Sequence, residues 1–175
     1  MHFFLQGERR VGKSTVIKKT LDILGEKGSF LLGGFFTWNG GKDDPHVYMK
    51  KAATGSTGEA LRLASWDEGK GRLTCDITVF ERFGADLLGD IGEARLIIMD
   101  ELGYLESGAV RFRKAVLDAV AGSVPILGVM RLGDVPWHEE IKSDPSVSIF
   151  DVNEENRDGL PAVLAKLLMT RILRD

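Results

Sequence analysis

Apolar and polar positions follow two different periods along this chain. Short continuous or alternating apolar runs predict strands, and apolar residues three or four positions apart predict helices. Strands are expected at residues 2–6, 30–36, 73–79, 95–100, 124–130 and 147–152. Helices are expected at residues 13–27, 80–94, 107–121 and 160–173. Because strands and helices alternate, the pattern predicts an α/β fold with a mostly parallel sheet flanked by helices.

The section from residue 46 to residue 72 departs from this alternation, because it has no helical period. Residues 46–54 and 59–66 have the character of two strands around the sequence Gly-Ser-Thr-Gly, and a second turn is expected at residues 68–71. We therefore expect an antiparallel β-hairpin extension at about residues 46–72. A chain of 175 residues is the size of one domain, so residues 1–175 are expected to form a single domain that includes the extension.

The stretch GERRVGKST, residues 7–15, joins the first predicted strand to the first predicted helix. Its Gly-x-x-x-x-Gly-Lys-Ser spacing is that of a phosphate loop, or P-loop. Gly7 and Gly12 let the backbone turn sharply and approach a ligand closely. Backbone N–H groups and the positive end of the helix then face the phosphates. The expected nucleotide contacts come from Gly7, Glu8, Arg9, Arg10, Val11, Gly12, Lys13, Ser14 and Thr15.

Several side chains of this loop have separate expected roles. Lys13 is expected to reach the β- and γ-phosphates, Ser14 to bind Mg²⁺, and Thr15 to assist at the α-phosphate. The adjacent Arg9 and Arg10 leave two alternatives open. They are solvated loop residues, or one of them leans over the triphosphate, where a guanidinium stabilises a transferring phosphoryl group.

The central strand 95–100 ends in an acid that is followed at once by a second acid. Asp100 is expected to hold Mg²⁺, and Glu101 is a candidate to polarise an attacking water. An acid directly after the metal-binding aspartate favours hydrolysis over transfer, because water is then the nucleophile. The chain has neither the Asn-Lys-x-Asp motif of small GTPases nor the Leu-Ser-Gly-Gly-Gln signature of transporter ATPases.

Two arginines are further candidates for the catalytic site. Arg131 follows strand 124–130, at the edge of the sheet where ligands bind, and is a candidate γ-phosphate sensor. Arg157 has two interpretations. It reaches the phosphates or the base, or its segment is simply the start of the last helix, with Asn156 or Asp158 capping the first turn.

Composition restricts the partners. The formal net charge of -3 and the isoelectric point near 5.7 argue against broad nucleic-acid binding as the main role, although a local basic patch remains compatible with them. No apolar run is long enough to span a membrane, and the first residues do not resemble a secretory signal, so we expect a cytoplasmic protein. The single Cys75 permits no internal disulfide and is expected to be a buried strand thiol. The composition gives no indication of the oligomeric state.

Isolated histidine and tryptophan residues have less specific expectations. His46 and His138 lack the spacing of metal ligands and are expected at the surface. Trp38, Trp66 and Trp137 are expected to pack rather than to stack on a base, with Trp137 near the rim of the site.

The chain resembles the small P-loop nucleoside-triphosphatase family, also called cancer-related nucleoside-triphosphatase, over nearly its whole length. The resemblance rests on four stretches: GERRVGKST, GFFT at 34–37, IIMDELGYLE at 97–106 and ENRDGL at 155–160. It implies a RecA-like P-loop NTPase core with an antiparallel β extension. It also implies that residues 97–104 line the nucleotide site. The chain differs from the family where Arg9-Arg10 replaces the usual Pro-Gly, and it lacks the arginine motif that usually follows Gly-Phe-x-Thr.

The resemblance and the motifs lead to one expected function and two alternatives. The expected function is Mg²⁺-dependent hydrolysis of nucleoside 5′-triphosphates, including ATP and GTP, to diphosphate and phosphate. The first alternative is a kinase of a nucleoside or another small molecule. The second is a slow nucleotide-dependent switch that docks a protein or nucleic-acid partner.

Overall fold

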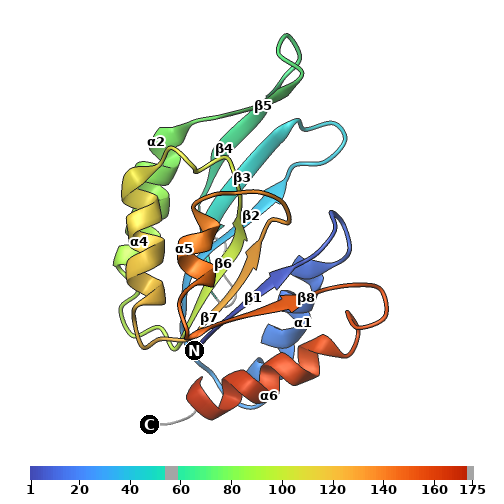
Figure 1. The fold of residues 1–175 in the computed structure, drawn as a ribbon, viewed down its shortest axis with the longest axis vertical. Coiled ribbons are helices and arrows are strands. Elements are labelled where there is room, and N and C mark those ends of the chain that lie inside the picture. Colours follow the sequence, from blue (N-terminus) through green and yellow to red (C-terminus); the bar gives the residue numbers. More distant parts are fainter. Residues whose placement is uncertain (54–58, 173–175) are drawn as a thin grey trace.

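Within residues 1–53 and 59–172, which the computed structural model describes, eight strands form one continuous sheet (Figure 1). The strand order is β5-β4-β3-β2-β6-β7-β1-β8. Strands β2, β6, β7, β1 and β8 are parallel to their neighbours, and β3, β4 and β5 continue the sheet antiparallel. The strands are β1 His2–Gln6, β2 Leu32–Asn39, β3 His46–Lys51, β4 Ala60–Asp67, β5 Arg72–Cys75, β6 Leu96–Leu102, β7 Ile126–Met130 and β8 Val147–Asp151.

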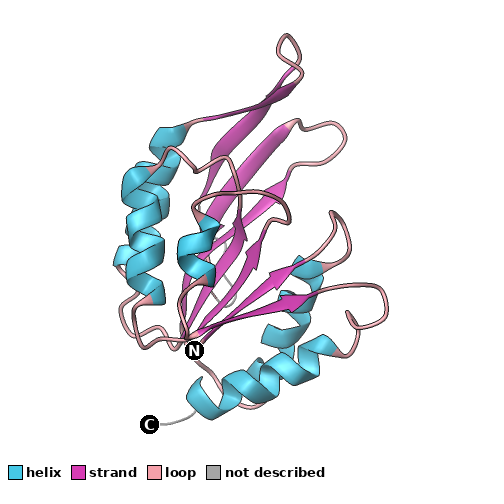
Figure 2. Cartoon of the chain, in the orientation of Figure 1, coloured by secondary structure: helices cyan, strands magenta, loops and turns pink. Residues whose placement is uncertain are grey.

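Helices cover both faces of the parallel part of the sheet (Figure 2). One face is covered by α1 and α6, which pack against each other, and the other by α3, α4 and α5. The helices are α1 Lys13–Gly25, α2 Ile77–Val79, the π-helical turn η1 Phe80–Gly84, α3 Ala85–Gly89, α4 Val110–Val120, α5 His138–Lys142 and α6 Leu160–Ile172. This arrangement confirms the predicted α/β fold class with its antiparallel extension.

Alternate side chains of β6 point into the two hydrophobic cores, one on each face of the sheet. Ile97 and Met99 point into the core shared with α3 and α4, whereas Leu96 and Ile98 point into the core shared with α1 and α6. All four side chains are buried. The central strand is therefore apolar on both faces, which explains why its sequence is a continuous apolar run.

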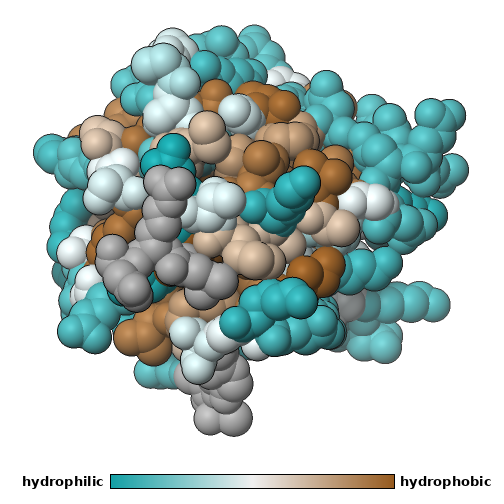
Figure 3. All heavy atoms as spheres, turned by 90° about the horizontal axis from the view of Figure 1, so that it is seen from below, coloured by the Kyte–Doolittle hydropathy of each residue, from teal (hydrophilic) through white to brown (hydrophobic). Residues whose placement is uncertain are grey.

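The underside of the molecule, where the parallel strands begin, carries exposed apolar residues. Val163 and Leu167 on α6 and Leu31 before β2 are exposed. Seen from below, apolar residues gather inside a polar rim (Figure 3). Along the described part of the chain, none of the helices is long and apolar enough to span a membrane.

The predicted strand 73–79 is wrong in its second half. Strand β5 ends at Cys75, and α2 begins at Ile77. The Asp76 carboxylate accepts a hydrogen bond from the Thr78 backbone N–H at 2.9 Å, which caps this short helix. The capping interaction prevails over the alternating pattern, because it satisfies a backbone donor locally.

The predicted helix 80–94 is shorter than expected. The segment forms the π-helical turn η1 and then α3, which ends at Gly89. The turn predicted at residues 55–58 and the last residue of the predicted helix 160–173 lie outside the described residues.

Helix α5 is absent from the predicted elements, and its first residue contradicts a prediction. His138 was expected at the surface but is buried, and its ring packs edge-on against Trp137 with the centroids 4.7 Å apart. Trp137 is buried, as a packing residue should be, whereas Trp66 is about half exposed and does not fit that expectation. The Cys75 thiol is only half-buried, and it donates to the Leu105 carbonyl at 3.3 Å.

Candidate nucleotide site

The phosphate loop lies between β1 and α1, at the edge of the sheet where the parallel strands end (Figure 1). Gly7 has φ 148° and Gly12 has φ 111°, both in the region that favours glycine. A Cβ atom on Gly7 would collide with the backbone carbonyl oxygen of Val152. Both glycines are therefore required by the backbone, and Gly12 leads directly into α1.

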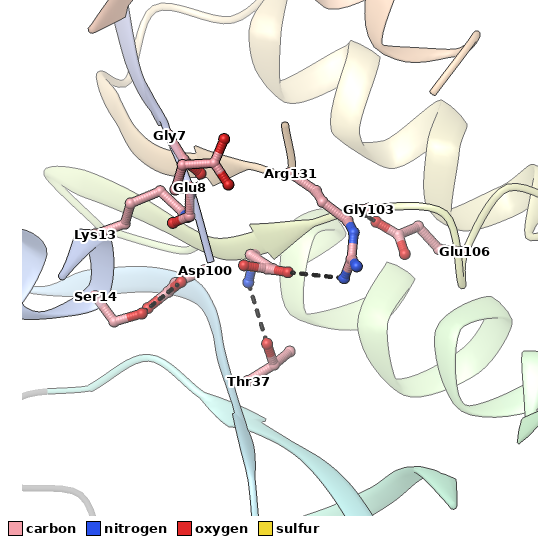
Figure 4. A network of polar contacts seen from close by, with 10 residues as sticks. Gly7, Glu8, Lys13, Ser14, Thr37, Asp100, Gly103, Glu106 and Arg131 are labelled. Carbon is pink, nitrogen blue, oxygen red and sulfur yellow. Dashed lines mark hydrogen bonds and ion pairs between the residues drawn. The ribbon is translucent and has the colours of Figure 1, made fainter. Parts of the chain in front are cut away.

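The Lys13 side chain folds back over the phosphate loop. Its Nζ donates to the carbonyl oxygens of Gly7, at 2.7 Å, and Glu8, at 2.8 Å (Figure 4). The side chain is buried, and this burial lowers the pKa of the ammonium group, with the positive charge of Arg131 acting in the same direction. The negative charges of Glu101 and Asp100 act in the opposite direction. The lysine thus lies inside the loop, close to where phosphate oxygens would bind.

Ser14 and Asp100 meet beside the loop, although 86 residues separate them. The Ser14 hydroxyl donates to Oδ1 of Asp100 at 3.2 Å (Figure 4). Asp100 is almost fully buried, and burial raises the pKa of its carboxyl group to about 7, with the charge of Glu101 adding to the rise and the Ser14 hydrogen bond opposing it.

These two oxygen donors fit a hard divalent cation such as Mg²⁺. In the described ranges 1–53 and 59–172, no three His, Cys, Asp or Glu side chains cluster in a way that could hold a metal ion. Mg²⁺ in nucleotide sites is commonly held by only one or two protein side chains together with phosphate oxygens and water. Ser14 and Asp100 therefore suit a cation that arrives with the nucleotide.

Glu101 follows Asp100 through a cis peptide bond, inside the last part of β6. Its backbone N–H donates to the hydroxyl of Thr37, near the end of β2, at 3.1 Å (Figure 4). The Glu101 side chain is 39% exposed, so water can reach the carboxylate. The structure thus places a solvent-accessible carboxylate next to the Ser14–Asp100 pair.

Arg131 comes to the same place from the end of the neighbouring strand β7. Its Nη1 lies 4.0 Å from Oε1 of Glu101, and its guanidinium lies 4.8 Å from the centre of the Tyr104 ring. Its backbone N–H donates to the Leu102 carbonyl at 2.8 Å. Glu101 and Arg131 are therefore brought together, as expected for strands whose carboxyl ends share one edge.

Arg157 lies against the phosphate loop. Its Nη1 donates to the Val11 carbonyl at 3.3 Å, and a Cβ atom on Gly12 would lie 3.7 Å from Arg157 Cδ. The arginine thus supports the loop backbone at Val11 and Gly12.

The residues around Arg157 do not form the expected side-chain cap. The Asn156 amide donates to the Asp151 carbonyl at 2.8 Å, and the Asp158 carboxylate pairs with Lys19 at 3.1 Å. The backbone carbonyl of Asn156 instead accepts a hydrogen bond from the N–H of Leu160, the first residue of α6, at 3.0 Å.

The remaining loop side chains are open to solvent. Glu8, Arg9, Arg10 and Thr15 are exposed. Arg10 has φ 66°, which is unusual for a residue other than glycine. Both arginines are exposed, so either guanidinium is free to meet solvent or a bound triphosphate.

Sequence reasoning assigned no role at this site to two residues that support it, Thr37 and Glu106, whereas Tyr104 and Trp137 lie close to where they were expected. The Glu106 side chain is buried and accepts a hydrogen bond from the Gly103 N–H, and burial raises the pKa of its carboxyl group to about 7. Thr37, Tyr104 and Glu106 all lie within stretches already singled out by the family resemblance, which was a usable signal. The hydrogen bond from Trp137 to Gly103 had no such signal.

Comparison with known proteins gives a consistent result. A family model described as NTPase matches residues 2–165. The chain is 30% identical over 165 residues to the nucleoside-triphosphatase THEP1 of Thermotoga petrophila, covering 91% of this chain and 88% of the relative. It is 26% identical over 191 residues to the mouse cancer-related nucleoside-triphosphatase homolog, covering 97% and 98%.

Two solved structures share the fold. The solution structure of a human cancer-related nucleoside triphosphatase is 25% identical and superposes with a TM-score of 0.78, covering 99% of both chains. The crystal structure of THEP1 from Aquifex aeolicus is 23% identical with a TM-score of 0.74, covering 96% of this chain and 99% of that one.

Proposed function

Since this chain belongs to the NTPase family and is a nucleoside-triphosphate hydrolase, we propose that it works with Mg²⁺ on ATP, GTP and other nucleoside 5′-triphosphates. The products are the nucleoside diphosphate and phosphate. The observation that carries the proposal is the meeting of Ser14 with Asp100 directly beside Glu101. This observation supports the proposal, because Ser14 and Asp100 would hold the cation and the Glu101 carboxylate would be open to water at the mouth of the phosphate loop.

Binding begins with the phosphate loop. Its backbone N–H groups and the N-terminal end of α1 attract the phosphates. Lys13 exchanges its contacts with the Gly7 and Glu8 carbonyls for β- and γ-phosphate oxygens. Ser14 and Asp100 would hold Mg²⁺, which would supply charge neutralisation at the phosphates.

Glu101 then orients a water molecule and accepts its proton. The water oxygen forms a bond to the γ-phosphorus as the bond from that phosphorus to the β–γ bridging oxygen breaks. The electron pair of the broken bond stays on the diphosphate, and Glu101 later returns the proton to solvent or phosphate. Arg131, about 4.0 Å from Glu101, stabilises the charge of the transferring phosphoryl group. Arg157 contributes indirectly by supporting Val11.

The substrate partners follow from this chemistry. Nucleoside triphosphates are the expected ligands, and tolerance of different bases fits the absence of the guanine-specific Asn-Lys-x-Asp motif. A cytoplasmic location, where nucleoside triphosphates and Mg²⁺ are abundant, also fits a chain whose one cysteine forms no internal disulfide.

Phosphate release from a panel of nucleotides tests the proposal. ATP, GTP, CTP and UTP are incubated with the protein in Mg²⁺ and, in parallel, in EDTA. We expect release from several nucleotides in Mg²⁺ and almost none in EDTA. Release that is unchanged by EDTA would refute the Mg²⁺ dependence, and release from one nucleotide alone would refute the breadth. A phosphorylated acceptor that suppresses phosphate release would favour the kinase alternative.

A further inference from the structure

The peptide groups around Gly103 are held from two sides by buried side chains. The Glu106 carboxylate accepts a hydrogen bond from the Gly103 N–H. The indole Nε1–H of Trp137 donates to the Gly103 carbonyl at 3.0 Å. Glu106 is 2% exposed and Trp137 is 4% exposed, so water does not compete for either bond. Both polar groups of one residue are therefore held in a dry setting, which favours a single backbone position.

Gly103 in turn lies under Arg131. A Cβ atom on Gly103 would lie 3.6 Å from Arg131 Cδ, so the arginine stem runs along the glycine backbone. The next residue, Tyr104, places its ring 4.8 Å from the guanidinium. The preceding residue, Leu102, accepts a hydrogen bond from the Arg131 backbone. Residues 102–104 thus support Arg131 from below, and Gly103 and Arg131 lie close together in Figure 4.

Arg131 needs this support, because its own polar contact is weak. The ion pair with Glu101 is 4.0 Å long, and both side chains are about two-fifths exposed. An exposed ion pair of this length contributes little to holding a long side chain in one rotamer. The geometry of the guanidinium therefore depends on the backbone beneath it.

We propose that Glu106 and Trp137 are positioning residues for hydrolysis. By holding Gly103 they set the direction in which Arg131 approaches the γ-phosphate. The inference rests on the proposed function, since it assigns Arg131 its role in the same reaction. A carboxylate is costly to bury, and an apolar side chain could fill the same space if packing alone were required.

The test is a pair of double-mutant cycles. Glu106→Gln keeps the size of the side chain but removes its charge, and Trp137→Phe keeps an aromatic ring but removes the N–H donor. Each is made alone and together with Arg131→Ala, and kcat and KM are measured with Mg²⁺-ATP. If the two residues act through Arg131, each single variant lowers kcat about 10-fold with KM changed by less than about threefold, and Arg131→Ala lowers kcat about 100-fold. Neither double variant should be slower than Arg131→Ala alone.

Other results would overturn the inference. Full kcat in the single variants would do so, and so would losses that multiply in the double variants. Unchanged kcat in Arg131→Ala would also overturn it, since there would then be nothing to position.

Two controls separate positioning from loss of stability. Trp66→Phe changes an exposed tryptophan on β4 and should leave kcat unchanged. Leu168→Ala opens the core on the other face of the sheet, so it should lower the unfolding temperature but leave kcat intact in the folded protein. A Glu106 or Trp137 variant that loses kcat only as much as Leu168→Ala does, at matched unfolding temperature, would contradict the inference.

The wild-type protein and Glu101→Gln keep this test distinct from the proposed function. If the wild type shows no Mg²⁺-dependent release, or if Glu101→Gln keeps full turnover, the proposed mechanism itself fails. If both behave as expected and the cycles are additive, only the positioning role is lost.

Discussion

Two loops at the same edge of the sheet acquire their shapes in different ways. The phosphate loop, residues 7–15, is shaped by its own backbone and by Lys13, which bonds to carbonyls within the loop. The catalytic loop, residues 101–106, is shaped in part by side chains outside it, including Thr37 on β2 and Trp137 before α5. The first loop, for which we propose phosphate binding, is shaped mainly by bonds within itself, whereas the second, which carries the proposed catalytic Glu101, is held largely by more distant parts of the chain.

The largest expected effect comes from removing the ammonium group of the phosphate loop. Lys13→Ala should lower kcat/KM by about 1000-fold, because the variant loses a charge-assisted contact that strengthens as charge develops on the γ-phosphate. Phosphate release and binding of a fluorescent nucleotide analogue measure the two parts of this loss. We expect both the rate of phosphate release and the affinity for the analogue to fall. A variant that retains wild-type affinity for the analogue would show that Lys13 does not contribute to nucleotide binding.

A substitution at Gly7 distorts the backbone of the phosphate loop without removing a charge. Gly7→Ala should lower the free energy of unfolding by about 2–3 kcal/mol, since the new methyl group meets the Val152 carbonyl in a strained backbone conformation. Chemical denaturation measures this change. Gly41→Ala is the matched control, because Gly41 also has positive φ, at 119°, but has open space around its Cβ position. Equal losses in the two variants would show that strain, and not the collision, dominates.

His138 follows Trp137, which supports the catalytic loop, and it should make the stability of the fold depend on pH. Burial lowers the pKa of His138 to about 4, with the charge of Lys142 acting in the same direction and that of Glu139 opposing it, and neither ring nitrogen has a hydrogen-bond partner. The unfolded chain, with a histidine pKa near 6.5, therefore binds more protons between pH 6.5 and 4, and stability falls as the pH drops through this window.

His138→Phe removes this proton uptake. Between pH 7.5 and pH 5, the unfolding free energy of the variant relative to the wild type should rise by about 2 kcal/mol, as measured by urea denaturation at each pH. The raised pKa values of Asp100 and Glu106 produce the opposite slope, but both proteins share them, so they cancel in the comparison. A constant difference between the two proteins at both pH values would contradict the prediction.

The smallest effect is expected where one neutral hydrogen bond holds the catalytic loop. Thr37→Val removes the hydroxyl that accepts from the Glu101 N–H but keeps the side-chain shape. A loss of about 1 kcal/mol in transition-state stabilisation corresponds to about a fivefold lower kcat, with nucleotide binding retained. Thr170→Val on the exposed side of α6 should leave kcat unchanged. Weaker nucleotide binding with kcat unchanged would instead assign Thr37 a role in binding the nucleotide.

The contrast between the loops also explains what could be predicted from the sequence. The glycine spacing of residues 7–15 encodes a local backbone, so the loop and its flanking elements were predictable. The proximity of Asp100 to Ser14 followed from the rule that parallel strands end at one edge. The hydrogen bond between Trp137 and Gly103 spans 34 residues and depends on the path of the chain before α5, which no local pattern specifies.

Two errors have the same origin. The alternation of residues 73–79 predicted a longer strand, but the Asp76 cap starts a helix. The His138 ring nitrogens have no polar partner among the described residues, and the ring is buried against Trp137 by the tertiary fold. In both cases the outcome depends on competing interactions that periodicity does not represent.

The central claim is that the phosphate loop binds and Glu101 drives hydrolysis. Glu101→Gln tests it most directly, with turnover and nucleotide binding measured on the same preparation. We predict that kcat falls by at least about 100-fold, while the affinity for Mg²⁺-nucleotide stays within about threefold of the wild type. Turnover equal to that of the wild type would contradict the claim.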